Sequence, residues 1–182
     1  MKELSLNILD IAENSVKAGA ALTEITIDET DDVLKLTIKD DGCGMSQETL
    51  LAVTNPFYTT RTTRKVGLGI PLLKMAAEQT GGEVTIVSKQ ADADDASHGT
   101  TVTARFYKTH IDFTPLGDVV SSIVTLIQGH PDTDFLFLHR SGDKEVMLDT
   151  RELRAVLGDI SLAEFEILSW IRGNLEEQYS IL

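Results

Sequence analysis

The sequence is poor in cysteine, in long apolar runs and in basic residues. Its 182 residues include one cysteine, Cys43, which excludes an internal disulfide framework and fits a reducing cytoplasm. No apolar run approaches the roughly 20 residues of a membrane-spanning helix, and the N-terminus lacks the pattern of a secretory signal. We therefore expect a cytoplasmic protein without a membrane-spanning segment.

The shortage of basic residues limits the classes of partner. The chain has 16 Lys and Arg against 29 Asp and Glu, which gives a formal net charge of −13. This charge repels nucleic acid and anionic membrane surfaces, so we expect neither as a partner. Residues 1–108 carry 11 basic and 16 acidic groups, and residues 109–182 carry 5 and 13. An anionic ligand of the first segment therefore needs positive charge close to its binding site.

Apolar residues are frequent enough to form a buried core, at 42% of the chain. In the first segment, apolar spacing predicts a helix over residues 3–18 that ends at Gly19. The remaining pattern predicts an antiparallel hairpin of strands 22–29 and 33–40, helices over about 46–54 and 70–80, strands 83–89 and 100–107, and a long loop over 54–69.

The character of the sequence changes near residue 109, where we place a domain boundary. Residues 109–182 are expected to form a small α+β C-terminal domain of unassigned role. Its pattern predicts a helix over 116–128 opened by Pro115, strands DFLFLH and EVMLD around a turn, and helices over 150–157 and 161–175. His130 and His139 stand apart, with no spacing typical of a metal site.

Short motifs occur in a fixed order in the first segment. Asp10, Asn14 and Lys17 follow one another at i, i+4 and i+7 and form a polar stripe on the first helix. The later motifs are DDGCG at 40–44, PFYTTR at 56–61, GLG at 67–69 and HGTT at 98–101. A polar stripe alone indicates only a solvated helix face, and GLG alone is uninformative, but the ordered set is specific.

The ordered set resembles the GHKL family of ATP-binding domains, which includes DNA gyrase B, Hsp90 chaperones, MutL and histidine kinases. The stretch LDIAENSVKAGA is similar to the N-box of MutL-like members, and NPFYTTR through HGTTVTARF is similar to the catalytic domain of histidine kinases. The resemblance covers residues 1–108 and implies an α+β Bergerat fold, a two-layer sandwich whose mixed sheet is covered by helices on one face. It also implies ATP and Mg²⁺ as cofactors.

The resemblance implies an adenine site around the DDGCG motif. Asp40 would end a strand and accept a hydrogen bond from the adenine amino group, which a carboxylate can do. Gly42 and Gly44 would allow the backbone to lie against the base, and Thr100 would support the same site. We expect Cys43 to be a small filler of this loop and not a reactive thiol.

The phosphate end of the site is implied by the later motifs and the first helix. Gly67, Leu68 and Gly69 would present backbone N–H groups to the phosphates at the start of a helix. The basic residues of the lid loop, which would supply local positive charge, are Arg61, Arg64 and Lys65. Asn14 would hold Mg²⁺ through its side-chain oxygen, and Lys17 would face a phosphate.

The chain departs from the family pattern in three places. Asp10 occupies the general-base position, where hydrolysing members have glutamate; its carboxylate reaches less far, so hydrolysis is expected to be slow. Glu13 is the alternative base, but its i, i+4 relation to Lys17 favours a surface ion pair. Lys65 replaces a glycine of the phosphate loop, and a strand that usually precedes the first helix is missing or comes from a partner.

His110 raises the question of a phosphoacceptor, because HIDFTPL echoes the phosphoacceptor box of sensor kinases. The acidic neighbour at position 111 is absent and the motif follows the ATP domain, so we expect a structural role. Three functions remain open: a stand-alone ATPase-like regulatory subunit with weak or partner-dependent hydrolysis, a protein kinase of the anti-sigma-factor type, and a nucleotide-sensing module without turnover. A protein partner is expected at the C-terminal domain or the lid, and a second copy of the chain is a further candidate.

Overall fold

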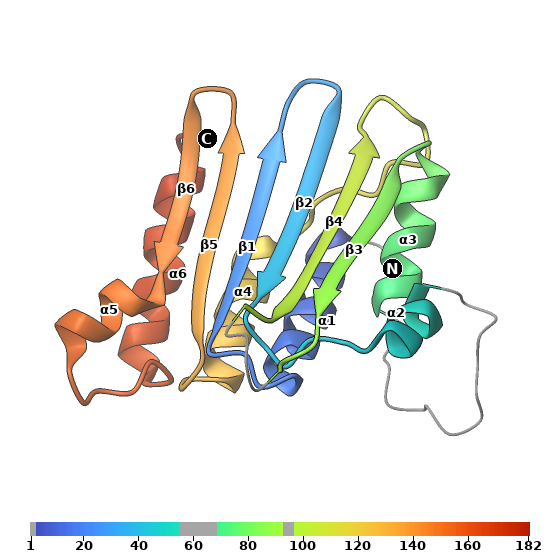
Figure 1. The fold of residues 1–182 in the computed structure, drawn as a ribbon. Coiled ribbons are helices and arrows are strands. Elements are labelled where there is room, and N and C mark those ends of the chain that lie inside the picture. Colours follow the sequence, from blue (N-terminus) through green and yellow to red (C-terminus); the bar gives the residue numbers. More distant parts are fainter. Residues whose placement is uncertain (1–2, 55–68, 93–96) are drawn as a thin grey trace.

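The computed structural model describes residues 3–54, 69–92 and 97–182, which form a layer of strands and a layer of helices (Figure 1). The elements in chain order are α1 (Leu4–Lys17), β1 (Leu22–Glu29), β2 (Val33–Asp40), α2 (Gln47–Thr54), α3 (Gly69–Gln79), β3 (Glu83–Lys89), β4 (Gly99–Tyr107), α4 (Val119–Gly129), β5 (Asp134–Ser141), β6 (Lys144–Asp149), α5 (Thr150–Leu157) and α6 (Phe165–Tyr179).

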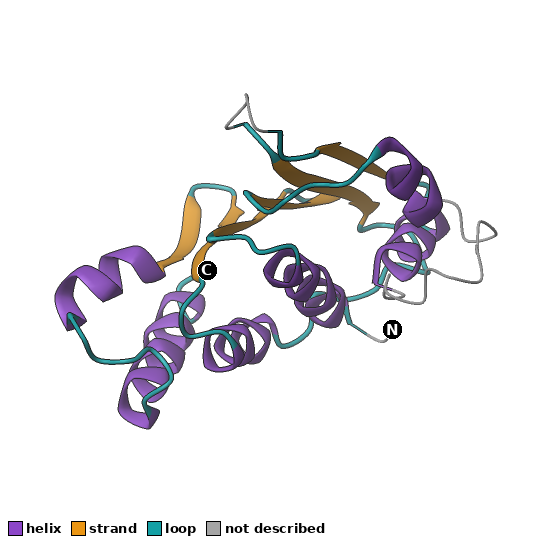
Figure 2. Cartoon of the chain, turned by 60° about the horizontal axis from the view of Figure 1, so that its bottom comes forward, coloured by secondary structure: helices purple, strands orange, loops and turns teal. Residues whose placement is uncertain are grey.

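The strands of the described residues form one mixed sheet in the order β3-β4-β2-β1-β5-β6. Neighbouring strands are antiparallel except for β1 and β5, which run parallel. The helices lie on one side of this sheet, as the view along its lower edge makes clear (Figure 2). The expected α+β sandwich, with helices on one face of a mixed sheet, is therefore confirmed.

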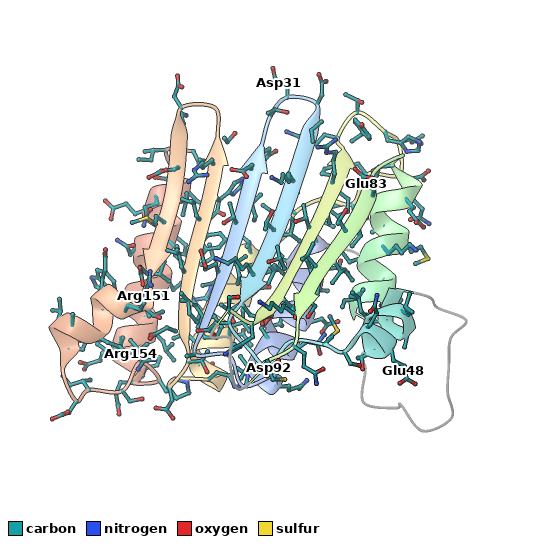
Figure 3. All side chains as sticks on the ribbon, in the orientation of Figure 1. Asp31, Glu48, Glu83, Asp92, Arg151 and Arg154 are labelled. Carbon is teal, nitrogen blue, oxygen red and sulfur yellow. The ribbon has the colours of Figure 1, made fainter. Side chains whose placement is uncertain are left out.

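The period-two pattern of the strands explains why only one face is covered. In β2, Leu34, Leu36 and Ile38 are buried, whereas Lys35 and Lys39, which alternate with them, are exposed. Alternating strand residues point to opposite faces, so the apolar set forms the core with the helices and the polar set faces water. Figure 3 looks onto this open face, with the β3 residue Glu83 near its upper edge.

The C-terminal segment continues the sheet of the first segment. Strand β5 pairs with β1 along its whole length, from Leu22 opposite Asp134 to Glu29 opposite Ser141. The chain at Pro115 and Leu116 also caps α1, because the carbonyl oxygens of these residues accept the N–H groups of Leu4 and Ser5 at 2.9 and 2.8 Å. The two segments thus share one sheet, and the domain division near residue 109 stays a prediction.

Two predicted helix starts were wrong. Helix α4 begins at Val119 and not at residue 116, because Gly117 takes a left-handed conformation (φ +76°) and the Asp118 side chain caps the helix by accepting from Ser121 N–H at 2.9 Å. Helix α6 begins at Phe165 and not at residue 161. Residues 161–164 form a turn instead, closed by a hydrogen bond from Glu164 N–H to the carbonyl oxygen of Ser161.

A chain of polar side chains joins the C-terminal helix to the first segment. His139 of β5 is buried, with Nδ1 at 2.9 Å from the Tyr179 hydroxyl and Nε2 at 3.0 Å from the Glu29 carboxylate. Glu29 also forms an ion pair with Lys108 at 2.6 Å. Burial lowers the pKa of His139 against the opposing effect of Glu29. The hydrogen bonds from Lys108 and His139 outweigh burial and lower the pKa of Glu29.

Because burial favours neutral His139, we predict that stability decreases as pH falls below about 6.5, the ordinary pKa of histidine, toward the lower value in the folded protein. The contribution of Glu29 is lost only at lower pH, below the ordinary range of a carboxyl group. Urea unfolding at pH 7.5, 6.5 and 5.5 measures this dependence. The variant His139→Gln should make the free energy of unfolding less dependent on pH, whereas the exposed control His110→Gln should not. The same pH dependence in the wild type and in both variants would contradict the prediction.

Candidate functional site

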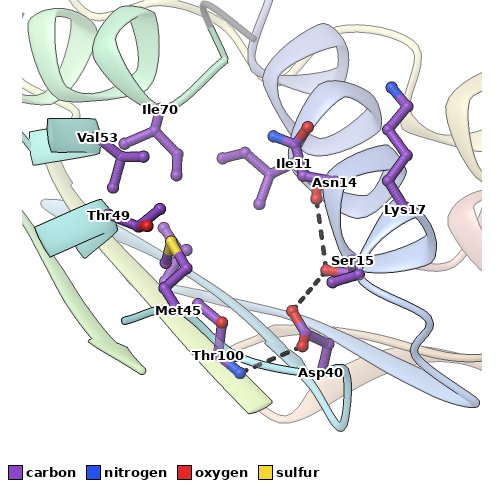
Figure 4. Close-up of a pocket in the computed structure, with 13 residues that line it drawn as sticks. Ile11, Asn14, Ser15, Lys17, Asp40, Met45, Thr49, Val53, Ile70 and Thr100 are labelled. Carbon is purple, nitrogen blue, oxygen red and sulfur yellow. Dashed lines mark hydrogen bonds between the residues drawn. The ribbon is translucent and has the colours of Figure 1, made fainter. Parts of the chain in front are cut away.

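A pocket of about 230 Å³ lies where the helix layer meets the lower ends of β2 and β4 (Figure 4). Helix α1 forms one wall, α2 and α3 the other, and the loop after β2 closes one side. The lining residues are Ile11, Asn14, Ser15, Lys17, Ala18, Asp40, Gly44, Met45, Thr49, Val53, Ile70, Thr100 and Val102. The pocket therefore combines an apolar lining with a few polar side chains, as ligand pockets typically do.

Asp40 is the buried acid of this pocket, with an exposed fraction of 9%. Its Oδ1 accepts from the backbone N–H of Gly42 at 3.0 Å and of Thr100 at 3.2 Å, and its Oδ2 accepts from the Ser15 hydroxyl at 2.8 Å. A buried carboxylate is costly unless donors surround it, and here they come from three separate elements. The Asp40 side chain is therefore held in one orientation.

The loop after β2 is anchored on both sides. On one side, Cys43 N–H donates to the carbonyl oxygen of Ala18 at 2.9 Å, and the Asp41 carboxylate accepts from the N–H groups of Ala21 and Leu22. On the other side, Ala91 N–H donates to the carbonyl oxygen of Cys43 at 2.8 Å. Cys43 itself is exposed and makes no disulfide. The loop is thereby fixed between the end of α1 and the end of β3.

Two glycines are required for this close approach. Gly44 has φ +67°, and a Cβ at this position would overlap the carbonyl oxygen of Lys89. Gly99 has φ +129°, and a Cβ there would overlap the carbonyl oxygen of Asp40. Only glycine adopts such conformations without strain. These positions explain why DDGCG and HGTT carry their glycines.

Helix α1 presents its polar stripe to the pocket and to the start of α3. Asn14 and Lys17 line the pocket, although the Lys17 side chain is 70% exposed. Asp10 lies one turn earlier, beside Gly69 at the N-terminus of α3: a Cβ on Gly69 would be 3.0 Å from that of Asp10. Glu13 points elsewhere, with its carboxylate 2.8 Å from His130 Nε2 and 3.8 Å from Lys17 Nζ.

The structure brings together most of the predicted site residues that it describes. Asn14, Lys17, Asp40, Gly44 and Thr100 line one pocket. Gly42 is bonded to Asp40, and Asp10 and Gly69 are neighbours at its α3 side. Arg61, Lys65, Gly67 and Leu68 lie outside the described residues.

Sequence reasoning missed Ser15 and the apolar lining. In the sequence, Ser15 falls on the helix face that also carries Leu4, Ile8 and Ile11, where a polar residue is itself a signal of a buried partner. Asn7 gives a similar signal: it is 1% exposed, and its amide nitrogen has no hydrogen-bond partner within the described part of the chain. The apolar lining residues Ile11, Val53 and Ile70 carry no distinguishing pattern, because core residues look the same in sequence.

Comparison with known proteins agrees with this geometry. The family model described as "Histidine kinase-, DNA gyrase B-, and HSP90-like ATPase" matches residues 2–110. The chain belongs to this family. The match covers α1 to β4, which together carry every lining residue of the pocket. The GHKL resemblance inferred from the motifs is therefore confirmed.

The curated relatives that match this GHKL chain include sensor proteins and kinases. Sporulation kinase C of Bacillus subtilis is 30% identical over 89 residues, which is 49% of this chain and 20% of the kinase. Sensor protein SrrB of Staphylococcus aureus is 34% identical over 94 residues, which is 49% of this chain and 16% of SrrB. Because the chain matches a fifth or less of these relatives, the similarity concerns only a part of each of them.

Among solved structures, the fold of the chain is similar to the "Aquifex aeolicus MutL ATPase domain complexed with ADP". The TM-score is 0.53 at 15% identity, over 86% of this chain and 69% of the MutL domain. The N-terminal domain of a DNA repair protein gives a TM-score of 0.52 at 13% identity over 87% of this chain. These likenesses cover more of the chain than residues 1–110, so the fold that they share includes part of the C-terminal segment.

Two further features are absent from the described residues: a cluster of metal-binding side chains and a membrane-spanning helix. Among residues 3–54, 69–92 and 97–182, no three His, Cys, Asp or Glu side chains are placed to hold a metal ion together, and no helix is long and apolar enough to cross a membrane.

His110 lies in a turn after β4, where its Nδ1 accepts from Asp112 N–H at 3.1 Å. Its structural role remains a prediction.

We predict that Gly44→Ala destabilises the protein by about 2 kcal/mol or more, because a left-handed backbone and an overlap with Lys89 coincide there. Gly173→Ala is the matched control: this glycine lies inside α6 with nothing near its missing Cβ, so alanine should stabilise by about 0.5–1 kcal/mol. Urea unfolding measures both changes. Unchanged stability of Gly44→Ala would contradict the loop geometry.

Proposed function

We propose that the protein binds ATP with Mg²⁺ in this pocket and acts as a stand-alone regulatory ATPase of low turnover. The observation that carries the proposal is the fixed Asp40 carboxylate in an otherwise largely apolar pocket. The match of the chain to a family of ATPases supports it. An apolar slot with one oriented acceptor suits a flat base that carries an amino group. The cytoplasm is the proposed location.

The adenine end of the site is proposed around Asp40. Ile11, Met45 and Val102 would contact the faces of the base, and Asp40 would accept its amino N–H. Thr100 contributes a backbone N–H to Asp40 and pairs its hydroxyl with Ser88 at 2.8 Å. The role of Gly42 and Gly44 includes closing the loop against α1 and β3, which keeps the backbone near the base.

The phosphate end is proposed between α1 and the N-terminus of α3. Gly69 opens a helix of 11 residues, whose first-turn N–H groups and dipole favour an anion. The lid residues Arg61, Lys65, Gly67 and Leu68 precede it in the sequence. Lys17, an exposed lining residue paired with Glu13 at 3.8 Å, would add positive charge there. Asn14 fits a magnesium ligand, because Mg²⁺ takes few protein oxygens and fills its shell with phosphate and water. When bound, Mg²⁺ would neutralise phosphate charge.

Asp10 is the proposed general base for hydrolysis. It lies at the α3 end of the site and one helical turn from Asn14, so it is on the side where phosphates would bind. Glu13, the competing carboxylate, is engaged by His130 and Lys17. The short reach of aspartate favours slow turnover, which a partner at residues 109–182 or at the lid would modulate. A kinase role is the alternative, supported by the named kinases among the relatives.

We predict that Asp40→Asn weakens ATP binding at least about 10-fold, because the amide would present N–H groups to the adenine amino group. Asp41→Asn is the matched control: its carboxylate bonds Ala21 and Leu22, outside the pocket, and an amide oxygen can accept the same N–H groups. Isothermal titration calorimetry with ATP and Mg²⁺ measures both. Wild-type affinity of Asp40→Asn would refute the adenine site.

Asp10→Asn should lower the rate of ATP hydrolysis by about 100-fold or more while leaving ATP affinity nearly unchanged, since a general base acts on the attacking water. Glu13→Gln serves as the control and should retain turnover, because Glu13 faces His130. Phosphate release and calorimetry on the same samples separate the two effects. If Glu13→Gln loses turnover and Asp10→Asn keeps it, the general base is Glu13 and not Asp10.

Incubation of the protein with Mg²⁺ and gamma-labelled ATP, alone and with cell extract, separates the candidate functions. Release of labelled phosphate supports the ATPase. Transfer of label to another protein supports the kinase, and bound but intact ATP supports a sensing module. A protein that binds no adenine nucleotide would exclude all three.

A further inference from the structure

We infer that Ser15 is a specificity-determining residue of the pocket: its hydroxyl holds the Asp40 carboxylate so that one acceptor position faces the ligand. The inference rests on the proposed binding of ATP and adds the residue that determines which nucleobase the pocket prefers. Ser15 comes from α1 and Asp40 from the end of β2. Both are buried, with exposed fractions of 3% and 9%, and both line the pocket (Figure 4).

The hydrogen bonds of the carboxylate leave little freedom. A carboxylate has about four acceptor positions, two on each oxygen. Oδ1 uses both of its positions, on the N–H groups of Gly42 and Thr100. Oδ2 uses one, on the Ser15 hydroxyl at 2.8 Å. Within the described residues, the position that remains is the second one on Oδ2.

The direction of the bond between Ser15 and Asp40 follows from chemistry. A serine hydroxyl carries one hydrogen, and a carboxylate oxygen only accepts, so Ser15 must be the donor. The competing acceptor on the same helix, the carbonyl oxygen of Ile11, is 3.4 Å away against 2.8 Å for Asp40. Hydrogen bonds to a charged acceptor are also the stronger kind. The hydroxyl therefore serves Asp40 and fixes the rotation of its carboxylate.

The remaining acceptor position selects for a donor on the ligand. Apolar lining residues such as Ile11, Val53 and Ile70 leave few alternative partners in the pocket. Adenine presents an amino N–H at its six-position, whereas hypoxanthine presents a carbonyl oxygen at the same carbon. The carbonyl would face the carboxylate as a second acceptor, so the site should reject it. ATP and inosine triphosphate, which differ at this group, are therefore the probes of choice.

Loss of the hydroxyl should affect the two nucleotides differently. In Ser15→Ala, Asp40 Oδ2 loses its protein donor, so only the bonds to Oδ1 hold the carboxylate. The terminal side-chain torsion of aspartate has a broad range of favourable angles, so the carboxylate can then rotate more freely. ATP would then meet an acceptor that is less well placed. The six-position of inosine triphosphate offers that acceptor no donor, so its affinity should change less than that of ATP. A purely structural defect of α1 would instead weaken both nucleotides alike.

Calorimetric titration with ATP and with inosine triphosphate, each with Mg²⁺, tests the inference. We expect the wild type to prefer ATP at least about 100-fold. Ser15→Ala should lose about 10-fold in ATP affinity and narrow the preference by a similar factor. Ser5→Ala is the matched control, because Ser5 is another buried serine of α1 whose hydroxyl donates to Glu3 at 3.3 Å, away from the pocket. The preference of Ser5→Ala for ATP over inosine triphosphate should equal that of the wild type.

An unchanged preference in Ser15→Ala would overturn the inference and leave the ATP site standing. A wild-type protein that fails to bind ATP would overturn the proposed function instead, so the two failures are distinct. If circular dichroism shows that Ser15→Ala does not fold, Ser15→Cys replaces it, because a thiol is similar in size and a weaker donor. A reduced preference in Ser15→Cys would support the inference, and a wild-type preference would contradict it.

Discussion

The buried Asp40 carboxylate is the interaction on which the pocket depends. An ionised acid in an apolar surrounding is stable only when donors surround it, and those of Asp40 come from α1, from the loop after β2 and from β4. Satisfying this one group therefore ties three elements together at the lower end of the sheet. The same bonds that offset the cost of burial also fix where the carboxylate can accept from a ligand.

Other features of the site follow from bringing backbone close to this carboxylate. Gly99 must lack a side chain because its Cα lies against the carbonyl of Asp40, and Gly44 because it lies against Lys89. Helix α1, which carries the proposed phosphate-side residues, is held at its start by the carbonyl groups of Pro115 and Leu116 and farther along by His130. The acidic C-terminal segment thus supports the helix of the site without lining the pocket in the part of the chain described.

Much of the fold could be predicted because its signals are local. Period-two alternation determined strands β1 to β6 closely, and the glycine after α1 marked the end of that helix. The starts of α4 and α6 were missed, because they depend on a left-handed Gly117 and on a turn at 161–164 that periodicity does not report. The motif residues of the site could be named, whereas its apolar lining could not, since lining and core residues share one pattern.

By itself the sequence determined the family, because the family's motifs follow one another in a fixed order along the chain, and the resemblance in turn implied the two-layer fold and the site residues. The tertiary structure decided what depends on contacts between distant residues. Parallel pairing of β5 with β1 makes one sheet of two segments, and the Glu13 carboxylate meets His130, which lies 117 residues later in the chain. The bond from Ser15 to Asp40 spans 25 residues of sequence, and only folding brings these two side chains within 2.8 Å.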